Sequence, residues 1–301
     1  MSENSGRLKL HTLLGDYKNA MPLKNGQVTS SSVELSFADV KVPNTAFKRV
    51  VRDIEFDVAE LAIATFLQAK AWDKKIALLP AVIVGGKAQH ASIVYNKERG
   101  KLNPKDIVGR RVGIRASSQT TVMWVRGILK YDYGVDVDNV KWITFEDPHV
   151  PEYRDPPNCE RAAPGKKIKT MLDEGELDAA CLGGDDLNDP KFLPLIPEPV
   201  AAAREWCKRE QTLPINHMLV VSQKLLRSNP DAVREVFRMI SDAKKASGMP
   251  TGDGVDALKL GVEANRKGIE IAIKYATQQQ LIPRSLTVDE LFDDVTRALG
   301  K

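Results

Sequence analysis

The sequence has few cysteines, and their arrangement predicts neither a disulfide framework nor a metal site. Its 301 residues include Cys159, Cys181 and Cys207, which are widely spaced and form no CxxC pair. Scattered cysteines in odd number are typical of a reducing compartment. The first residues, MSENSGRLKL, lack the apolar stretch of a secretory signal, and no apolar run approaches membrane-spanning length. These absences predict a cytoplasmic protein that does not cross a membrane.

Concentrated charge is also lacking. Lys and Arg number 44 against 40 Asp and Glu, which gives a net charge of +4, and the basic residues are dispersed along the chain. A nucleic-acid-binding protein usually shows a basic stripe, so we do not expect a nucleic-acid partner. A small positive excess is compatible with attraction of an anionic small molecule. The length suffices for two lobes, each with its own core.

Several motifs of cofactor and catalytic sites are missing from the sequence. No GxGxxG follows a predicted strand, no P-loop occurs, and no GxSxG marks a hydrolase. Four residues of metal-ligating type are candidates for a metal site, but their spacing matches no local ligand motif: His149, Glu152, Asp185 and His217. We therefore expect neither a resident metal nor an organic cofactor.

Strand and helix patterns alternate along most of the chain. Apolar runs predict strands at 8–14, 33–37, 76–84, 91–95, 111–115, 140–145 and 217–221. Helical patterns occur at 119–129, 167–174, 230–246 and 255–279, and capping residues predict further helix starts at Asn44 and Thr287. This alternation predicts an α/β architecture with mostly parallel sheets.

The order of these segments predicts a first lobe, a second lobe and a return to the first. We place the first lobe at 1–100, the second at 101–214 and the returning part at 215–301. Side chains just past the carboxyl ends of strands face the ligand crevice in open α/β sheets. The sequence therefore predicts a ligand cleft between the lobes.

The stretch GRRVGIRASSQTTVMWVRGIL, at 109–129, is a candidate carboxylate site. A short strand ends at Arg115, and a hydroxylated run enters a helix at about Gln119. A helix N-terminus presents free N–H groups and partial positive charge to an anion, and Arg115 adds a guanidinium fork. An ordinary capped helix is the alternative interpretation. The substrate-binding candidates here are Arg115, Ser117, Ser118, Gln119, Thr120 and Thr121.

Further candidates lie at other strand ends. Asp16 and Tyr17 follow the first strand, where a turn residue and a packed aromatic are equally plausible roles. His217 begins the returning strand and is within reach of the predicted cleft, although a histidine satisfied by local hydrogen bonds is the commoner case. Glu60 lies in the apolar segment FDVAELAIATFL, near the start of a predicted helix, and either faces solvent or lines the cleft.

The Pro-rich segment 146–165, EDPHVPEYRDPPNCERAAPG, shows no strand or helix pattern. Long loops of this kind are often functional. It carries His149, whose imidazole titrates near neutral pH and suits proton transfer. Glu152 either orients His149, acts as a base or is a solvated charge. Arg154 either clamps a carboxylate or orders the loop.

Five segments together resemble the 4,5-dihydroxyphthalate decarboxylase family: FDVAELAIATFL, SIVYN, RRVGIR followed by TTxxWxRGIL, HVPEYRDPP and GELDAA. The segment HVPEYRDPP, at His149–Pro157, is the most specific, whereas GELDAA is common among solute-binding proteins. The similar segments extend from Leu8 to about Val221. The chain departs from the family at 116–119, where a bulkier residue is usual, which puts the substrate in doubt more than the fold.

The resemblance implies an α/β, two-lobe fold like that of the type II periplasmic solute-binding proteins. It also implies a cytoplasmic enzyme that removes one carboxyl group from an aromatic dicarboxylate such as 4,5-dihydroxyphthalate, giving a dihydroxybenzoate and CO2. Such chemistry needs a proton donor, a phenol acceptor and cations for the remaining carboxylate. We assign these catalytic roles to His149, Glu152 and Arg154. The alternatives are an enzyme acting on a different acid and a non-catalytic solute-binding protein, serving a transporter, for an aromatic or other small carboxylate.

Overall fold

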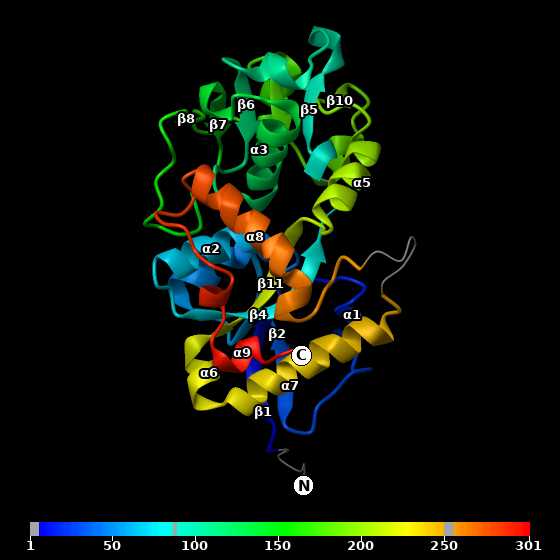
Figure 1. Ribbon diagram of the computed structural model, residues 1–301, viewed down its shortest axis with the longest axis vertical. Coiled ribbons are helices and arrows are strands. Elements are labelled where there is room, and N and C mark those ends of the chain that lie inside the picture. The colour runs from blue at the N-terminus through cyan, green and yellow to red at the C-terminus, as the bar shows by residue number, and fades with distance from the viewer. Residues whose placement is uncertain (1–5, 87–88, 250–255) are drawn as a thin grey trace. The chain divides into compact units, whose positions relative to one another are not determined.

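A computed structural model describes residues 6–86, 89–249 and 256–301 (Figure 1). The chain divides into two compact units. Unit 1 comprises Met1–Gly85, Ile215–Ile273 and Arg284–Lys301, and unit 2 comprises Gly86–Pro214 and Lys274–Pro283. Each unit is built on one β-sheet with helices packed against it. The chain therefore forms most of one unit, then the other, and returns to the first.

The sheet of unit 1 has the strand order β2-β1-β3-β11-β4. Its strands are β1 Leu8–Leu13, β2 Val33–Phe37, β3 Val58–Ala62, β4 Ile76–Gly85 and β11 Ile215–Ser222. β1 is parallel to β2 and β3, whereas β11 is antiparallel to β3 and β4. Because β11 runs in the opposite direction, its first residues lie at the edge where β1, β3 and β4 end.

Helices cover this sheet, and the amphipathic α7 supplies much of its core. The helices of unit 1 are α1 Met21–Lys24, α2 Ile63–Ala71, α6 Gln223–Ser228, α7 Pro230–Ala246, α9 Asp294–Arg297 and the first part of α8 Val262–Gln278. α7 buries Val233, Val236, Phe237 and Ile240, a spacing that places them on one helical face. The Asn229 side chain accepts a hydrogen bond from the Ala232 N–H, which confirms the predicted start of α7.

The sheet of unit 2 has the order β10-β5-β9-β6-β7-β8. Its strands are β5 Ile93–Asn96, β6 Arg111–Ile114, β7 Lys141–Thr144, β8 Cys159–Arg161, β9 Ala179–Cys181 and β10 Phe192–Pro194. The neighbours β9, β6, β7 and β8 are parallel, so they end at one edge, while β5 is antiparallel to β9 and β10. Both sheets are thus mixed, rather than mostly parallel as the sequence predicts.

The helices of unit 2 are α3 Thr120–Tyr133, α4 Ile168–Glu174 and α5 Pro199–Glu210, joined by the last part of α8. An aromatic cluster packs three of these helices together. The Trp124 ring of α3 meets the Trp206 ring of α5 at 5.9 Å and the Tyr275 ring of α8 at 5.6 Å, both edge to face. This cluster packs the buried Tyr275 against α3 and α5, which explains why residues 274–283 belong to unit 2.

The structure differs from the sequence-based expectation at several elements. The helix start predicted at Asn44 is wrong. The chain forms a 3-10 turn at Pro43–Ala46 instead, and the residue that precedes this turn is Val42. The 146–165 segment contains β8. Thr287 and Glu290 form the predicted reciprocal hydrogen bonds, but the helix they begin is one 3-10 turn at Asp289–Leu291. The predicted helix at 255–279 begins at Val262, and Val255 lies outside the described residues.

The first boundary between the units, at 85–86, differs from the lobe limit expected at 100, whereas the second, at 214–215, coincides with the expected limit. β5 pairs with β9 and β10, so residues 93–96 belong to the sheet of unit 2 rather than to the first lobe. The segment Lys274–Pro283 also groups with unit 2, although it lies in the returning part of the sequence.

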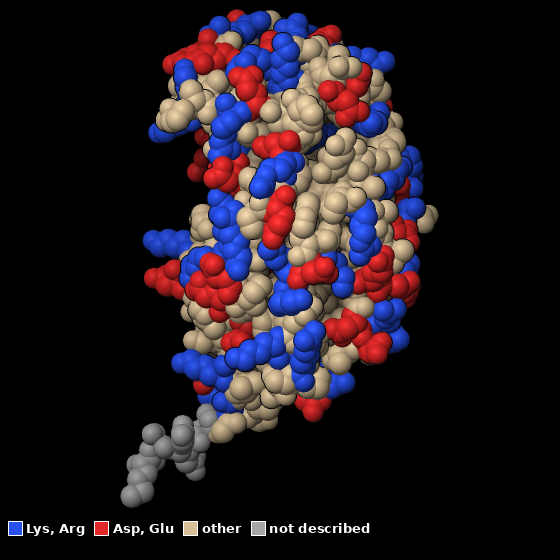
Figure 2. All heavy atoms as spheres, turned by 90° about the vertical axis from the view of Figure 1, so that its left-hand side faces the viewer, with Lys and Arg blue, Asp and Glu red and all other residues tan. Residues whose placement is uncertain are grey.

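Charged side chains of both signs share the surface. On the face shown in Figure 2, Lys and Arg are interspersed with Asp and Glu. Many form ion pairs, such as Arg238 with both Glu235 and Asp242 on α7. Among the described residues, no helix has the length and apolar character needed to cross a membrane.

Candidate functional site

The candidate site of unit 1 is centred on Glu60, a carboxylate in β3 whose side chain is 0% exposed. Its Oε1 accepts the Gly15 N–H at 2.7 Å, and its Oε2 lies 2.9 Å from His217 Nδ1. The Tyr17 hydroxyl also hydrogen-bonds to it. A buried carboxylate requires such donors, because water no longer solvates its charge. We call Gly15, Tyr17, Glu60 and His217 the unit 1 site.

The strand order explains how four residues distant in sequence meet. Glu60 pairs in register with Leu219, and His217 pairs with Ala62, where β3 ends. Gly15 follows the neighbouring end of β1. A Cβ at position 15 would lie 2.7 Å from the Tyr17 ring, so glycine lets this ring pack against the backbone and reach Glu60. The unit 1 site therefore lies at the edge where ligands bind in open α/β sheets.

The Glu60 contact sets the tautomer and orientation of His217. A carboxylate only accepts hydrogen bonds, so Nδ1 carries the proton and Nε2 presents a lone pair. The Phe47 ring packs edge to face against the imidazole at 5.2 Å, and the His217 side chain is 15% exposed. The imidazole is therefore held rigidly and can accept a proton at Nε2.

Tyr17 remains a hydrogen-bond donor to Glu60. Burial, followed by the negative charge of Glu60, raises the pKa of the Tyr17 hydroxyl well above its usual value. Asp16, in contrast, lies on the surface, where its Oδ1 is 2.6 Å from Lys24 Nζ and its side chain is 72% exposed. Of the two residues predicted to follow the first strand, the structure brings only Tyr17 to Glu60 and His217.

In unit 2, Arg115 lies just past the end of β6, as predicted. Its carbonyl accepts the N–H groups of Phe145 and Glu146, which ties the ends of β6 and β7 together. Its Nη1 is 3.3 Å from Glu146 Oε2, and its side chain is 29% exposed. Arg115 thus presents a partly exposed cation whose present partner is a surface carboxylate.

The hydroxylated residues before α3 are more deeply buried than is expected of an anion pocket that is open to solvent. Ser117, Ser118 and Thr120 are each less than 5% exposed. The Ser117 hydroxyl is 3.2 Å from the Tyr153 hydroxyl and 3.2 Å from Arg126 Nη1, so it faces the interior. Gln119 precedes the first residue of α3 without a side-chain cap, and Thr121 is partly exposed. The assignment of 117–121 to substrate stays a prediction.

Tyr153 anchors the 146–165 loop. It is 2% exposed, and burial raises its pKa to about 12, so its hydroxyl stays protonated against Ser117. The exposed Arg154 donates to the carbonyls of Pro151 at 2.5 Å and Tyr153 at 3.0 Å, which orders the loop. His149 is half-buried and Glu152 is exposed. Their catalytic roles stay predictions.

Two residues to which the sequence assigns no role, Tyr153 and Arg126, form much of the observed geometry of unit 2, and Glu60, for which the sequence leaves two roles open, is buried rather than facing solvent. Glu60 has a readable signal, because it is the one carboxylate among the mostly apolar residues 58–67. In the part of the chain that the structure describes, no three His, Cys, Asp or Glu side chains are grouped to hold a metal ion. Asp185 begins a surface turn in unit 2.

Comparison with known proteins confirms the resemblance that the motifs indicate. No family model matches the chain. The 4,5-dihydroxyphthalate decarboxylase of Comamonas testosteroni is 28% identical over 241 residues, which cover 74% of this chain and 71% of that protein. The enzyme of the same name from Pseudomonas putida is 27% identical over 214 residues, or 66% of this chain and 81% of that protein.

Solved structures confirm the predicted fold class. The alkanesulfonate-binding protein SsuA from Xanthomonas axonopodis pv. citri, bound to MOPS, matches with a TM-score of 0.61. The match covers 97% of this chain and 99% of that chain at 12% sequence identity. At 12% sequence identity, the structural similarity is evidence for the fold alone. The chain has the two-lobe α/β fold of the periplasmic binding proteins.

Proposed function

We propose that the chain is a carboxy-lyase that removes one carboxyl group from a hydroxylated aromatic dicarboxylate such as 4,5-dihydroxyphthalate. The observation that carries the proposal is the Glu60–His217 pair, in which a buried carboxylate orients an imidazole for proton transfer. The two relatives named as 4,5-dihydroxyphthalate decarboxylases support the substrate class. A protein that only holds a solute has no need of an oriented proton acceptor, whereas this reaction requires one.

The chemistry places an electron pair on a ring carbon. When the hydroxyl para to the leaving carboxylate gives up its proton, electron density rises at the carbon that bears this carboxylate. That carbon takes a proton, its bond to the carboxylate breaks, and CO2 leaves while the bonding pair returns to the ring. We assign His217 as the base that takes the phenolic proton and later returns it. Glu60 is a positioning residue that stabilises the imidazolium formed in between.

The ring carbon needs a second proton donor, and the carboxylate that stays on the ring needs a cation. His149 is our candidate for the donor, because imidazole side chains in general suit proton transfer near neutral pH and the segment around it resembles the decarboxylase family. Arg115 is our candidate for the cation. A substrate carboxylate would take the place of Glu146 against its guanidinium, as a bidentate partner. Arg154 is the weaker candidate, because its guanidinium is engaged by carbonyls of its own loop.

The purified protein should convert 4,5-dihydroxyphthalate to one dihydroxybenzoate and one CO2 per substrate. The assay follows the phenolic product by chromatography and the CO2 by a coupled measurement, with and without a chelator. Tight binding without product would show a solute-binding protein instead. Loss of turnover in the chelator would contradict the expectation of a metal-free reaction. Related hydroxylated phthalates, assayed in parallel, define the ring substitution that is accepted.

His149→Ala should abolish turnover while the fold is retained. The half-buried loop position predicts a small effect on the free energy of unfolding. Steady-state kinetics and circular dichroism measure the two effects. His11→Ala is the matched control, since His11 is also a half-buried histidine and has no assigned role. A near-normal rate in the His149 variant would remove that residue from the mechanism.

A further inference from the structure

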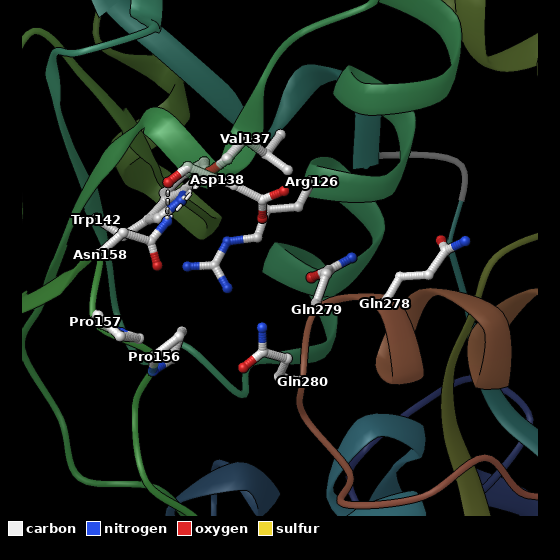
Figure 3. A pocket seen from close by; sticks show the side chains of 10 residues that line it. All are labelled: Arg126, Val137, Asp138, Trp142, Pro156, Pro157, Asn158, Gln278, Gln279 and Gln280. Carbon is white, nitrogen blue, oxygen red and sulfur yellow. Dashed lines mark hydrogen bonds between the residues drawn. The ribbon is translucent and has the colours of Figure 1, made fainter.

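Unit 2 contains a cavity of about 240 Å³ that the proposed reaction does not use (Figure 3). We call it the Arg126 pocket. Part of its wall comes from Val137 and Asp138, which precede β7, and from Pro156 and Pro157, which precede β8. It therefore lies around the amino ends of these strands. Arg115 and Glu146 follow β6 and β7, at the opposite edge of the same sheet.

Arg126 is the charged centre of the pocket. It is 3% exposed, and Figure 3 shows its guanidinium pointing into the cavity. The Trp142 ring lies 4.3 Å from its Cζ, Nη1 is 3.2 Å from Ser117 Oγ, and Nη2 is 3.7 Å from Cys159 Sγ. These neighbours are neutral and hold the guanidinium in one plane.

The charge of Arg126 lacks a close counter-charge. Within the described parts of the chain, its guanidinium contacts Ser117, Cys159 and Trp142 but no carboxylate, and its buried Nε–H has no hydrogen-bond acceptor. Asp155 is near enough for Arg126 to act on its pKa, but burial is the larger cause and leaves that pKa raised. Burying a cation without a paired anion costs free energy, because water no longer solvates the charge. The pocket is therefore suited to bind an anionic ligand next to Arg126.

Amide groups face Arg126 from the end of α8. Gln280 points toward the guanidinium from the opposite wall (Figure 3). Its backbone φ of 56° lies in the left-handed region, at a helix end closed by the Leu281 N–H to Ala276 carbonyl bond, where glycine is favoured. The Oε1 atom of the neighbouring Gln279 is buried and accepts no hydrogen bond from the described residues.

We propose that the Arg126 pocket binds a small monocarboxylate with one hydroxylated ring. The carboxylate pairs with Arg126, the ring lies against Trp142 and the Pro156–Pro157 surface, and the hydroxyl groups bond the Gln279 and Gln280 amides. The volume suits a single ring rather than a larger ligand. Asp138 at the rim, 73% exposed and 3.4 Å from Lys130, disfavours a second negative charge. The proposal rests on unit 2 alone and stands without the proposed reaction.

Trp142 provides a reporter inside the pocket, because its indole N–H donates to the Val137 carbonyl at 3.0 Å. The experiment records the indole N–H signals of the ¹⁵N-labelled full chain in a ¹H–¹⁵N correlation NMR spectrum. The Trp142 signal is assigned as the one that disappears in Trp142→Phe. Titration with 3,4-dihydroxybenzoate should shift this signal saturably. Gln280→Glu should weaken binding by at least tenfold, because a carboxylate at position 280, which points toward the guanidinium, then competes with the ligand carboxylate for Arg126. Arg126→Lys should also weaken it, since the planar fork is lost.

Two controls separate this pocket from other sites. Gln211→Glu makes the same change at another left-handed glutamine of unit 2, which does not line the cavity, and should leave the titration unchanged. Glu60→Gln alters the unit 1 site and should also leave it unchanged. Three results would overturn the proposal: an unshifted Trp142 signal, equal affinities in the Gln280→Glu and Gln211→Glu variants, or an equal shift with sulfate at the same concentration.

Discussion

Glu60 shows how the burial of one side chain determines what its neighbours can do. Its carboxylate is removed from water and receives donors from Gly15, Tyr17 and His217. Removing one partner of a buried charged pair typically costs 3–5 kcal/mol, because the other charge stays buried. A truncation such as His217→Ala would therefore mix folding with chemistry. Informative variants keep the hydrogen bond between residues 60 and 217 and remove the charge or the proton transfer.

Glu60→Gln should lower kcat by roughly 10²–10⁴-fold while KM changes little. The amide oxygen can still accept from His217 Nδ1, although the amide NH2 then faces the Gly15 N–H and loses that hydrogen bond. The amide carries no charge to stabilise the imidazolium that forms during the reaction. Steady-state kinetics on 4,5-dihydroxyphthalate separate kcat from KM, and thermal unfolding reports whether the variant is folded. A purely structural role would lower the melting temperature and leave kcat per folded molecule unchanged.

Matched variants complete this test. Glu34→Gln removes a half-exposed carboxylate of the same sheet, paired with Arg7 on the surface, and should leave kcat unchanged. His217→Gln can still donate an amide hydrogen bond to Glu60, so it should fold and lose turnover. A Glu60→Gln variant with the kcat of the unaltered chain would remove the Glu60–His217 pair from the mechanism.

At the scale of elements, the packing of α3 against α8 depends on a glycine inside a helix. A Cβ on Gly127 would overlap the Tyr275 ring, which also stacks on Tyr131 at 5.5 Å. Glycine in a helix interior normally lowers stability by about 1 kcal/mol relative to alanine. The aromatic ring is held by its neighbours and cannot move aside, so packing outweighs helix propensity here.

Gly127→Ala should therefore lower the free energy of unfolding by about 1–3 kcal/mol, the usual range for an overpacked core. Urea unfolding measures the change. The effect should disappear in a Tyr275→Ala background, where alanine at 127 has space and helix propensity favours it by about 1 kcal/mol. If Gly127→Ala stabilises the chain that retains Tyr275, the packing argument fails.

Elements with local signals at both ends are those that the sequence predicts well. α7 begins at Pro230 after the Asn229 cap and repeats its apolar residues at helical spacing, and both features are visible in the sequence. β8 and β10 have three residues each, too few for any periodicity. Their pairing with β7 and β5 is decided by tertiary contacts. α5, at Pro199–Glu210, buries only Ala203 and Trp206 and gives only a weak pattern.

The candidate site is less predictable than the fold, because its contacts are distant in sequence. The segment that contains Glu60 is apolar throughout, so neither the strand–helix boundary at Ala62 nor the direction of Glu60 can be read from it. Glu60 and His217 are 157 residues apart, and only the strand order brings them together. Ser117 looks like an exposed hydroxyl in the sequence, but it is buried by Tyr153, 36 residues later.

At the scale of the whole molecule, each unit carries a buried or paired group with a shifted pKa. His90 of unit 2 is 2% exposed, and burial, followed by the charge of Arg209, lowers its pKa to about 4. Glu235 of unit 1 has a pKa of about 2, chiefly because Arg238 hydrogen-bonds its carboxylate. Both shifts favour the folded state at neutral pH, and the two groups respond to acid in different ranges.

The direction of each effect follows from proton binding in the unfolded chain. Unfolded His90 takes up a proton near pH 6.5, whereas the folded protein resists it, so this stability is complete above about pH 6.5 and is lost toward pH 4. The stability from Glu235 is complete above about pH 4.5 and is lost toward pH 2. Unit 2 should therefore weaken first on acidification, by about 2–3 kcal/mol at pH 4.

Tryptophan fluorescence can follow unit 2 separately. In Trp72→Phe the remaining tryptophans, Trp124, Trp142 and Trp206, all lie in unit 2. Their urea midpoint should fall between pH 7.5 and pH 5, and His90→Gln should remove most of this fall, because the amide does not titrate. Glu235→Gln, the control in unit 1, should leave the pH dependence of this midpoint unchanged. Equal pH dependence with and without His90 would show that its burial does not govern the acid response of unit 2.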